Sequence, residues 1–295
     1  MTAAVVISYN ADRYLASCLQ SLRAQGASPR VVVDNGSRDR SRAMAAAADS
    51  EHRWIDTGRN LGYGQAANIG VAATDDPYVL VCNPDLELHD GALKALVAAL
   101  DADPGLALVG PRILNPDGTT YPSARTFPNL VDAIGHGLLG LIAPGNPFTR
   151  RYRRLDRDYG QPASVDWVSG ACFVARRTAW EQIGGFSSDY FMYLEDVDLC
   201  WRFGAAGWRI GYEPAAVVVH VQGVSASQHP YRMLLAHHRS LWRFAVSTTT
   251  GPRRLALPVV AVGLAGRLVV ASAQHRLAGD KRPVAAKVSE PGPVP

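Results

Sequence analysis

The chain has 295 residues, of which 47% are hydrophobic and 19% charged, and its formal net charge is +4. This composition excludes a disordered chain, a coiled coil and a collagen-like fibre, and the length is ample for one large domain or two small ones. The four cysteines lie far apart with no CxxC pair, which excludes a disulfide scaffold and a zinc ribbon and suits a reducing compartment.

Short apolar runs alternate with segments of helical spacing in the first part of the chain. The sequence predicts strands at residues 3–8, 30–33, 54–56, 78–82 and 106–109, and helices at 12–25, 39–48, 64–73 and 90–101. Strands that alternate with helices of this length are typical of a doubly wound, mostly parallel sheet. We therefore expect an α/β fold whose ligand crevice lies at the carboxyl ends of the strands.

The rest of the chain is less regular. Residues 115–164 are rich in Pro, Gly and Arg and predict no regular element. After them we expect strands at 165–176 and 216–221, helices at 178–183, 194–206 and 231–246, and a Pro- and Lys-rich disordered tail from residue 280.

Polar side chains follow the apolar strands at the points where they end. They are Ser8-Tyr9-Asn10, Asp34-Asn35-Gly36-Ser37, Asn83-Pro84-Asp85 and His220. A carboxylate there can accept hydrogen bonds from a base or ribose, or hold a divalent metal beside a diphosphate. A histidine there can bind the metal or the diphosphate. Asn, Asp and Gly are also ordinary turn residues, and a lone histidine is more often structural, so the residues alone leave these roles open.

Residues 60–68 contain the pattern GxGxxA, which also occurs in dinucleotide-binding fingerprints. That fingerprint belongs to the first strand-to-helix turn, and here that turn is residues 8–10, without glycine. We therefore expect Gly62 and Gly64 to let the backbone approach a nucleotide, or to shape a turn.

Three carboxylates, Glu195, Asp196 and Asp198, open the helix predicted at 194–206. The helix dipole favours acids near an N-terminus, which is the structural alternative. Their apolar neighbours predict a partly buried turn, where like charges raise the pKa of at least one carboxyl, as a general base needs. Helical geometry puts Glu195 and Asp198 on one side and leaves Asp196 to face a substrate.

Together these segments resemble the inverting family 2 glycosyltransferases, which have the GT-A fold. The resemblance is greatest to the rhamnosyltransferase branch that builds actinobacterial cell-wall linkers and bacterial O-antigens. It covers residues 3–245 and rests on VVISYN (5–10), VVVDNGSRD (31–39), NLGYGQAANIG (60–70), VLVCNPDLEL (79–88), SGACFVARR (169–177), GGFSSDYFMYLEDVDLCWR (184–202) and HVQGVS (220–225).

The resemblance implies roles for single residues. Asp34 stands where the family binds the nucleobase, and Asp196 stands at its catalytic base. The donor nucleotide is expected to contact Tyr9, Asn10, Asp34, Asn35, Ser37, Asn60, Gly64 and Asn83. The acceptor side is expected to be supported by Gly170, Glu195, Asp198, Trp201 and Arg202.

The metal site departs from the family pattern. The first acid of the family's DxD motif is Asn83 here, which removes one anionic ligand. We expect Mg²⁺ or Mn²⁺ to be held by Asp85, His220 and the substrate diphosphate. The implied mechanism is a single displacement, in which Asp196 deprotonates the acceptor hydroxyl and the configuration of the sugar inverts.

The resemblance implies transfer of L-rhamnose from dTDP-L-rhamnose to a polyprenyl-diphosphate-linked sugar, N-acetylglucosamine in actinobacterial relatives. Another donor, UDP-galactofuranose or UDP-glucose, stays open, as does a catalytically silent scaffold that binds nucleotide sugars.

We expect a catalytic domain at 1–228, with a nucleotide-sugar half at 1–110 and an acceptor half at 111–228. A helical segment at 229–279 and a tail at 280–295 follow it.

The charge is unevenly distributed. Residues 1–228 hold 20 Lys and Arg against 24 Asp and Glu, whereas residues 229–295 hold 10 against 2. A nucleic-acid partner is not expected, because the body is acidic. The basic C-terminal part predicts contact with phosphates or an anionic membrane, its alternative being a solvated helical face.

Two segments bear on the membrane. Residues 255–273 are apolar apart from Arg267, and arginine at a bilayer centre costs about 2.5–3.5 kcal/mol. We therefore expect this segment to lie in the interface at the cytoplasmic face of the inner cell membrane. A packed soluble helix and a membrane span are the less favoured alternatives. The apolar loop 137–148 precedes five arginines, which suits a docking site for a lipid diphosphate or a flap over the acceptor cleft. The oligomeric state, a homodimer included, stays open.

Overall fold

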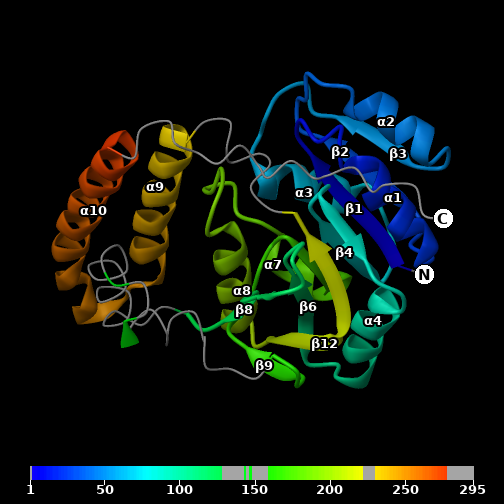
Figure 1. The fold of residues 1–295 in the computed structure, drawn as a ribbon. Coiled ribbons are helices and arrows are strands. Elements are labelled where there is room, and N and C mark those ends of the chain that lie inside the picture. The colour runs from blue at the N-terminus through cyan, green and yellow to red at the C-terminus, as the bar shows by residue number, and fades with distance from the viewer. Residues whose placement is uncertain (1, 128–142, 144–145, 148–158, 222–229, 278–295) are drawn as a thin grey trace.

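A large mixed sheet runs through the middle of the molecule, with a pair of C-terminal helices beside it (Figure 1). The computed structural model describes residues 2–127, 143, 146–147, 159–221 and 230–277. The strand order is β3-β2-β1-β4-β11-β6-β12-β5, with β7 beside β6 and β9 beside β12. The arginine-rich loop predicted to dock a lipid and the tail at 280–295 lie outside the described residues, apart from residues 143 and 146–147.

The first half of the sheet is parallel. Its strands are β1 (Thr2–Ser8), β2 (Arg30–Asp34), β3 (Arg53–Asp56) and β4 (Tyr78–Cys82), and its crossover helices are α1 (Leu15–Ala24), α2 (Ser41–Ala48) and α3 (Tyr63–Ala72). β1 pairs with both β2 and β4. Continuous apolar runs form these central strands because helices cover both faces. The carboxyl ends of β1, β2 and β4 therefore meet at one edge.

The second half of the sheet is mixed. It contains β5 (Leu86–Leu88), β6 (Leu106–Leu114), β7 (Thr120–Tyr121), β9 (Ala163–Val165), β11 (Cys172–Arg176) and β12 (Arg209–His220), while β8 (Ala124–Arg125) and β10 (Trp167–Val168) form a separate pair. β11 is antiparallel to β4, with Cys172 opposite Cys82. This reversal brings the residues just before β11 to the carboxyl edge of β4.

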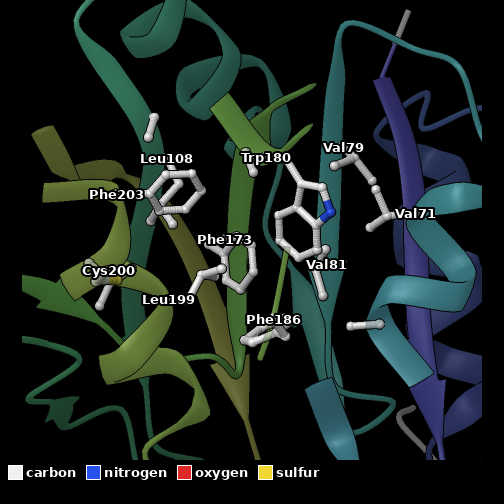
Figure 2. Packing of buried hydrophobic residues seen from close by; sticks show 14 of the residues in the cluster. Val71, Val79, Val81, Leu108, Phe173, Trp180, Phe186, Leu199, Cys200 and Phe203 are labelled. Carbon is white, nitrogen blue, oxygen red and sulfur yellow. The ribbon is translucent and has the colours of Figure 1, made fainter. Parts of the chain in front are cut away.

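Two cores lie on opposite faces of the sheet. Alternate β1 side chains point to opposite faces, so Ala4 and Val6 pack in one core and Val5 and Ile7 in the other. The first core includes α1 and α4 (Ala92–Ala102), and the second includes α3, α7 (Arg177–Ile183) and α8 (Glu195–Ala205). Figure 2 shows the second core, where the rings of Phe173, Trp180 and Phe186 lie 5.4–6.4 Å apart.

The structure divides one predicted strand and lengthens another. The strand predicted at 165–176 is broken around Gly170, because backbone groups there bond to a side chain and a loop instead of a neighbouring strand. The strand predicted at 216–221 is the end of β12, whose register shifts between Glu213 and Val217. Pro214 lies in this interval and has no N–H to donate to a ladder.

The C-terminal helices pack beside α8. They are α9 (Pro230–Thr248), the 3₁₀ turn η2 (Gly251–Ala256) and α10 (Leu257–Leu277). Ser240 Oγ of α9 donates to the carbonyl of Met192 (3.0 Å), and the ring of Phe244 contacts Trp201. α10 packs on α9 and leaves Val259 and Val262 exposed. The segment Gly251–Gln274 is long and apolar enough to cross a membrane.

Candidate active site

The ends of β1 and β2 are joined by hydrogen bonds between backbone and side chains. The N–H of Asn10 donates to Ser37 Oγ (2.9 Å), and the N–H of Arg38 donates to Asn10 Oδ1 (2.9 Å). Asn10 has a φ of 50°, a left-handed conformation that asparagine tolerates better than most residues. The preceding residue, Tyr9, is half-buried at this edge. The predicted residues at these two strand ends are therefore brought together.

Asp34 ends β2 and is almost fully buried. The N–H of Ser37 donates to its Oδ1 atom (3.2 Å). Burial raises the pKa of Asp34, and the hydrogen bonds from Ser37 oppose that shift. A carboxylate has about four acceptor positions, so Asp34 retains capacity for an N–H or O–H of a ligand.

Asn35 and Asn60 bond to each other beneath the loop that precedes α3. Asn35 Nδ2 donates to Asn60 Oδ1 (3.1 Å) and to the carbonyl of Gly62 (3.2 Å). Asn35 Oδ1 accepts from the N–H of Leu61 (2.8 Å). Both donors of the Asn35 amide are thereby used within the protein, so this side chain holds the loop in position.

The two glycines of the GxGxxA pattern pack against the segment before α8. Gly62 has a φ of 89°, and an added Cβ would collide with the carbonyl oxygen of Phe191. An added Cβ on Gly64 would lie 2.8 Å from Phe186 Cβ. Of the two roles expected for these glycines, the shaping of a closely packed turn is the one that these contacts favour. Gly64 itself is buried.

Asn83, Asp85 and His220 form a small cluster at the ends of β4 and β12. His220 Nε2 lies 3.1 Å from Asp85 Oδ1 and 3.3 Å from Asn83 Nδ2. Asp85 and His220 are both buried, and His220 Nδ1 has no hydrogen-bond partner in the described part of the chain. In the same part, no three His, Cys, Asp or Glu side chains gather closely enough to hold a metal ion by themselves.

The three carboxylates at the start of α8 lie in three different environments. Glu195 is buried, and its Oε2 atom has no hydrogen-bond partner among the described residues. Asp198 is buried and accepts a 2.7 Å hydrogen bond from Arg202 Nε. Asp196 is half-buried, as its position on the helix predicts. It is therefore the one of the three that keeps access to a ligand.

Burial sets the titration of the first two acids. It raises the pKa of Glu195 to about 8, with a further contribution from the charge of Asp196. It also raises the pKa of Asp196, against the opposing hydrogen bonds from the N–H groups of Gly170 and Val197. These N–H groups lie 2.8 Å from Oδ2 and 2.9 Å from Oδ1 of Asp196. A carboxylate with a raised pKa is a stronger base than one in water.

The segment before β11 links Asp196 to the β4 cluster. Gly170 donates its N–H to Asp196, and the carbonyl of the next residue, Ala171, accepts from the N–H of Asn83 (2.9 Å). The carbonyl of Gly170 accepts from Tyr63 Oη (2.6 Å). An added Cβ on Gly170 would lie 3.1 Å from Asp196 Cβ. The acid at the start of α8 is thus tied through one backbone segment to the residues at the end of β4.

The contacts described for Trp201 and Arg202 are with residues other than Asp196 and the cluster at the end of β4. The ring of Trp201 lies 5.1 Å from that of Phe127 and 6.0 Å from that of Phe244, centroid to centroid. Arg202 bonds to Asp198 and, through Nη1, to the carbonyl of Ile183 (3.1 Å). Their contacts are those of residues that fix α8 against its neighbours.

Sequence reasoning missed three residues that build this site. Tyr63 bonds to the Gly170 carbonyl from another helix, and no local pattern signals so distant a pairing. Tyr193 and Leu194 precede the acidic turn and have φ angles of 66° and 62°. Such left-handed conformations are costly for bulky residues and mark functional turns. They could not be read from the residue types, because neither is a glycine or an asparagine.

The family model described as "Glycosyl transferase family 2" matches residues 3–184. The chain belongs to this family. It is a glycosyltransferase, and the predicted family and enzyme class are confirmed.

Known relatives extend the match beyond the family model. The chain is 39% identical over 260 residues to N-acetylglucosaminyl-diphospho-decaprenol L-rhamnosyltransferase of Mycobacterium tuberculosis, covering 84% of each chain. It is 29% identical over 232 residues to a rhamnosyltransferase of Escherichia coli, covering 75% of this chain and 83% of the relative. The resemblance to the rhamnosyltransferase branch is confirmed.

Solved structures confirm the GT-A fold of this family 2 glycosyltransferase. A mannosyltransferase from Pyrobaculum calidifontis, in complex with GDP-Man and Mn²⁺, matches with a TM-score of 0.57 at 17% identity. The match covers 94% of this chain and 80% of that one. TarS of S. aureus matches with a TM-score of 0.55 at 14% identity, covering 95% and 75% of the two chains. At these identities the likeness is one of fold.

Proposed function

We propose that this glycosyltransferase transfers L-rhamnose from dTDP-L-rhamnose to N-acetylglucosamine carried on a polyprenyl diphosphate. The observation that carries the mechanism is the half-buried side chain of Asp196, held by the N–H of Gly170 in a segment that also bonds the β4 loop. The donor and acceptor are supported by the 39% identity to a relative named for rhamnosyl transfer to N-acetylglucosaminyl-diphospho-decaprenol.

In this proposal the donor nucleotide lies along the ends of β1, β2 and β4. Asp34 accepts hydrogen bonds from the base, and Tyr9 and Asn10 line the same edge. Asn35, Ser37 and Gly64 hold the surrounding loops in shape through their hydrogen bonds and close packing. Asn60 and Asn83 contribute amide groups next to these loops.

The residues at the β4 end fit a divalent cation shared with the substrate. Asp85 would supply one carboxylate and His220 one ring nitrogen, and the diphosphate of a donor would add the oxygen ligands that Mg²⁺ or Mn²⁺ prefers. When bound, such an ion neutralises charge on the departing diphosphate. The side chain of Asn83 offers a further polar contact to that diphosphate.

Asp196 takes the proton in the chemical step. The acceptor O–H proton passes to a free lone pair of the Asp196 carboxylate, and the acceptor oxygen bonds to the anomeric carbon. The bond from that carbon to the diphosphate oxygen breaks on the opposite side, so the configuration inverts. Glu195, Asp198 and Arg202 support the helix turn, Trp201 fixes α8 against α9, and Gly170 sets the position of the carboxylate.

We also propose that the enzyme works at the cytoplasmic surface of the cell membrane. The exposed apolar side chains of α10 and the arginines of η2, Arg253 and Arg254, match an interface of acyl chains and anionic head groups. Co-sedimentation with anionic vesicles should remove the full chain from solution. Binding that is equal for neutral and anionic vesicles would contradict the electrostatic part.

A donor panel tests the function. The purified enzyme would receive N-acetylglucosaminyl-diphospho-polyprenol, Mn²⁺ and, in turn, dTDP-rhamnose, UDP-galactofuranose, UDP-glucose and GDP-mannose. Mass spectrometry should detect a product one deoxyhexose heavier with dTDP-rhamnose alone. Transfer from a UDP-sugar instead would keep the mechanism and discard the donor. No transfer together with binding of a nucleotide sugar would favour the catalytically silent scaffold.

A further inference from the structure

A groove of about 410 Å³ lies between α9 and the segment that precedes α8. Arg232, Arg239 and Arg243 line it from α9, and Leu61 and Phe191 line it from the catalytic body. The groove therefore combines three guanidinium groups with apolar walls. None of the residues expected to contact the donor is part of its lining.

The three arginines form one stripe. They are spaced by seven and four residues along α9, which places them on the same face of an α-helix. Within the described residues none of them forms an ion pair, and the acid that lines the groove is Asp189. The groove thus has an excess of positive charge, and its occupant should be anionic.

The walls of the groove are the segments that build the site. The carbonyl of Phe191 accepts from the N–H of Tyr63 (3.2 Å), and Tyr63 Oη bonds to Gly170, which holds Asp196. On the other side, Ser240 of α9 bonds to the carbonyl of Met192. A ligand in the groove therefore lies against the same short segment, residues 187–194, that leads into the acidic turn of α8.

We propose that this groove binds the diphosphate and the first isoprene units of the lipid-linked acceptor. The inference rests on the proposed function for the identity of the acceptor. Arginine binds phosphate oxygens through paired N–H donors, and Leu61, Phe191, Met233 and Leu235 supply apolar contacts for the chain. α10, which packs on α9, adds exposed apolar side chains beside this helix. The described residues that line the groove belong to other segments than the 137–157 loop, which the sequence suggests for the same ligand.

Direct binding of farnesyl diphosphate, measured by calorimetry in a neutral detergent, tests the groove without any transfer reaction. The variant combines Arg239→Gln with Arg243→Gln, and the matched control combines Arg23→Gln with Arg42→Gln, two exposed arginines outside the groove. We expect the groove variant to bind at least about tenfold more weakly, because it loses two charge-assisted contacts. The control should bind as the wild type does. Equal affinity of groove variant and wild type would overturn the inference.

Two further arms distinguish diphosphate binding in the groove from a folding defect and from a general membrane contact. Farnesol, which lacks the diphosphate, should bind wild type and groove variant alike, whereas a loss that extends to farnesol would point to damaged folding and overturn the assignment. If the variant loses binding to anionic vesicles but keeps farnesyl diphosphate, the stripe is a general membrane contact and the inference fails. If farnesyl diphosphate binding behaves as expected but no donor supports transfer, the proposed function fails and the groove stands.

Discussion

At the ends of β2 and β4, polar side chains are held mainly by one another, whereas at the start of α8 three acids lie in one turn. Asn35 uses all its amide donors inside its loop, and Asp85 lies beside His220. At α8, Glu195 has an oxygen without a partner among the described residues, and Leu194 before it has a left-handed backbone. One end of the site is a hydrogen-bonded frame, and the other stores electrostatic and backbone strain.

The difference indicates a division of labour. A frame of mutual hydrogen bonds suits the binding of a large, polar donor in a fixed place, since little has to move when the ligand arrives. A carboxylate kept in a partly buried, like-charged turn suits proton transfer, because its pKa is raised. Single substitutions at the two ends should therefore change different measurable quantities.

The largest effect is expected from Asp196→Asn. Removing a general base slows the chemical step by about 10²–10⁴-fold, and the transfer rate constant in single-turnover assays should fall by this amount. The matched control is Asp198→Asn, two residues along the same turn, whose side chain still accepts from Arg202. That variant should keep most of the rate, and equal losses in the two variants would argue against Asp196 as the base.

Next in size is the effect of Arg202→Met on stability. Arg202 is the charged partner of the buried Asp198, so the variant leaves a buried carboxylate without its cation. Removing one partner of a buried pair costs about 3–5 kcal/mol, and urea denaturation should show a loss near the lower value because Arg202 is 26% exposed. Arg209→Met breaks the more exposed pair with Asp103 and should cost less than about 1 kcal/mol. Equal costs would show that burial does not distinguish the pairs.

A smaller change is expected at the frame. Asp85→Asn removes the only carboxylate of the β4 cluster, so donor affinity in the presence of Mn²⁺ should fall by about 10–100-fold. Without metal the variant and the wild type should bind the donor similarly. Asp75→Asn, an exposed acid before the amino end of β4, is the control and should leave calorimetric affinity unchanged. A metal-independent loss in the Asp85 variant would show that Asp85 does not act through a metal ion.

A last prediction concerns the pH dependence of stability. Burial raises the pKa of Glu195 from 4.5 to about 8, so the folded protein binds this proton more tightly than the unfolded chain does. The contribution of Glu195 to stability is therefore full below pH 4.5 and is lost as the pH rises to about 8. Glu195→Gln should remove up to about 1.4 kcal/mol per pH unit of this negative slope in urea unfolding. An unchanged slope would mean that Glu195 ionises normally.

Much of this architecture could be predicted from local patterns, and the missing parts have a common cause. The strands β1, β2 and β4 are continuous apolar runs, and the partial burial of Asp196 follows from helical periodicity. β5 has three residues and forms only because β12 lies beside it. The bonds of Gly170 to Asp196 and to Tyr63 join segments far apart in the chain. Such pairings have no local signal.

The groove on α9 illustrates the same limit. The basic character of the C-terminal part is visible in the composition, and it predicts an anionic partner. The packing of α9 decides which of its faces lies opposite Phe191 and its neighbours. That face in turn decides which arginines line the groove together. The sequence therefore predicts the kind of ligand better than its place.

The most direct test of the division of labour is a calorimetric comparison of donor binding in Asp196→Asn and Asp85→Asn, with dTDP-rhamnose and Mn²⁺ under identical conditions. We expect the Asp196 variant to bind the donor as tightly as the wild type while the Asp85 variant loses affinity. If the Asp196 variant loses as much donor affinity as the Asp85 variant, the acid at the start of α8 belongs to the donor frame, and the assignment of Asp196 as the base is contradicted.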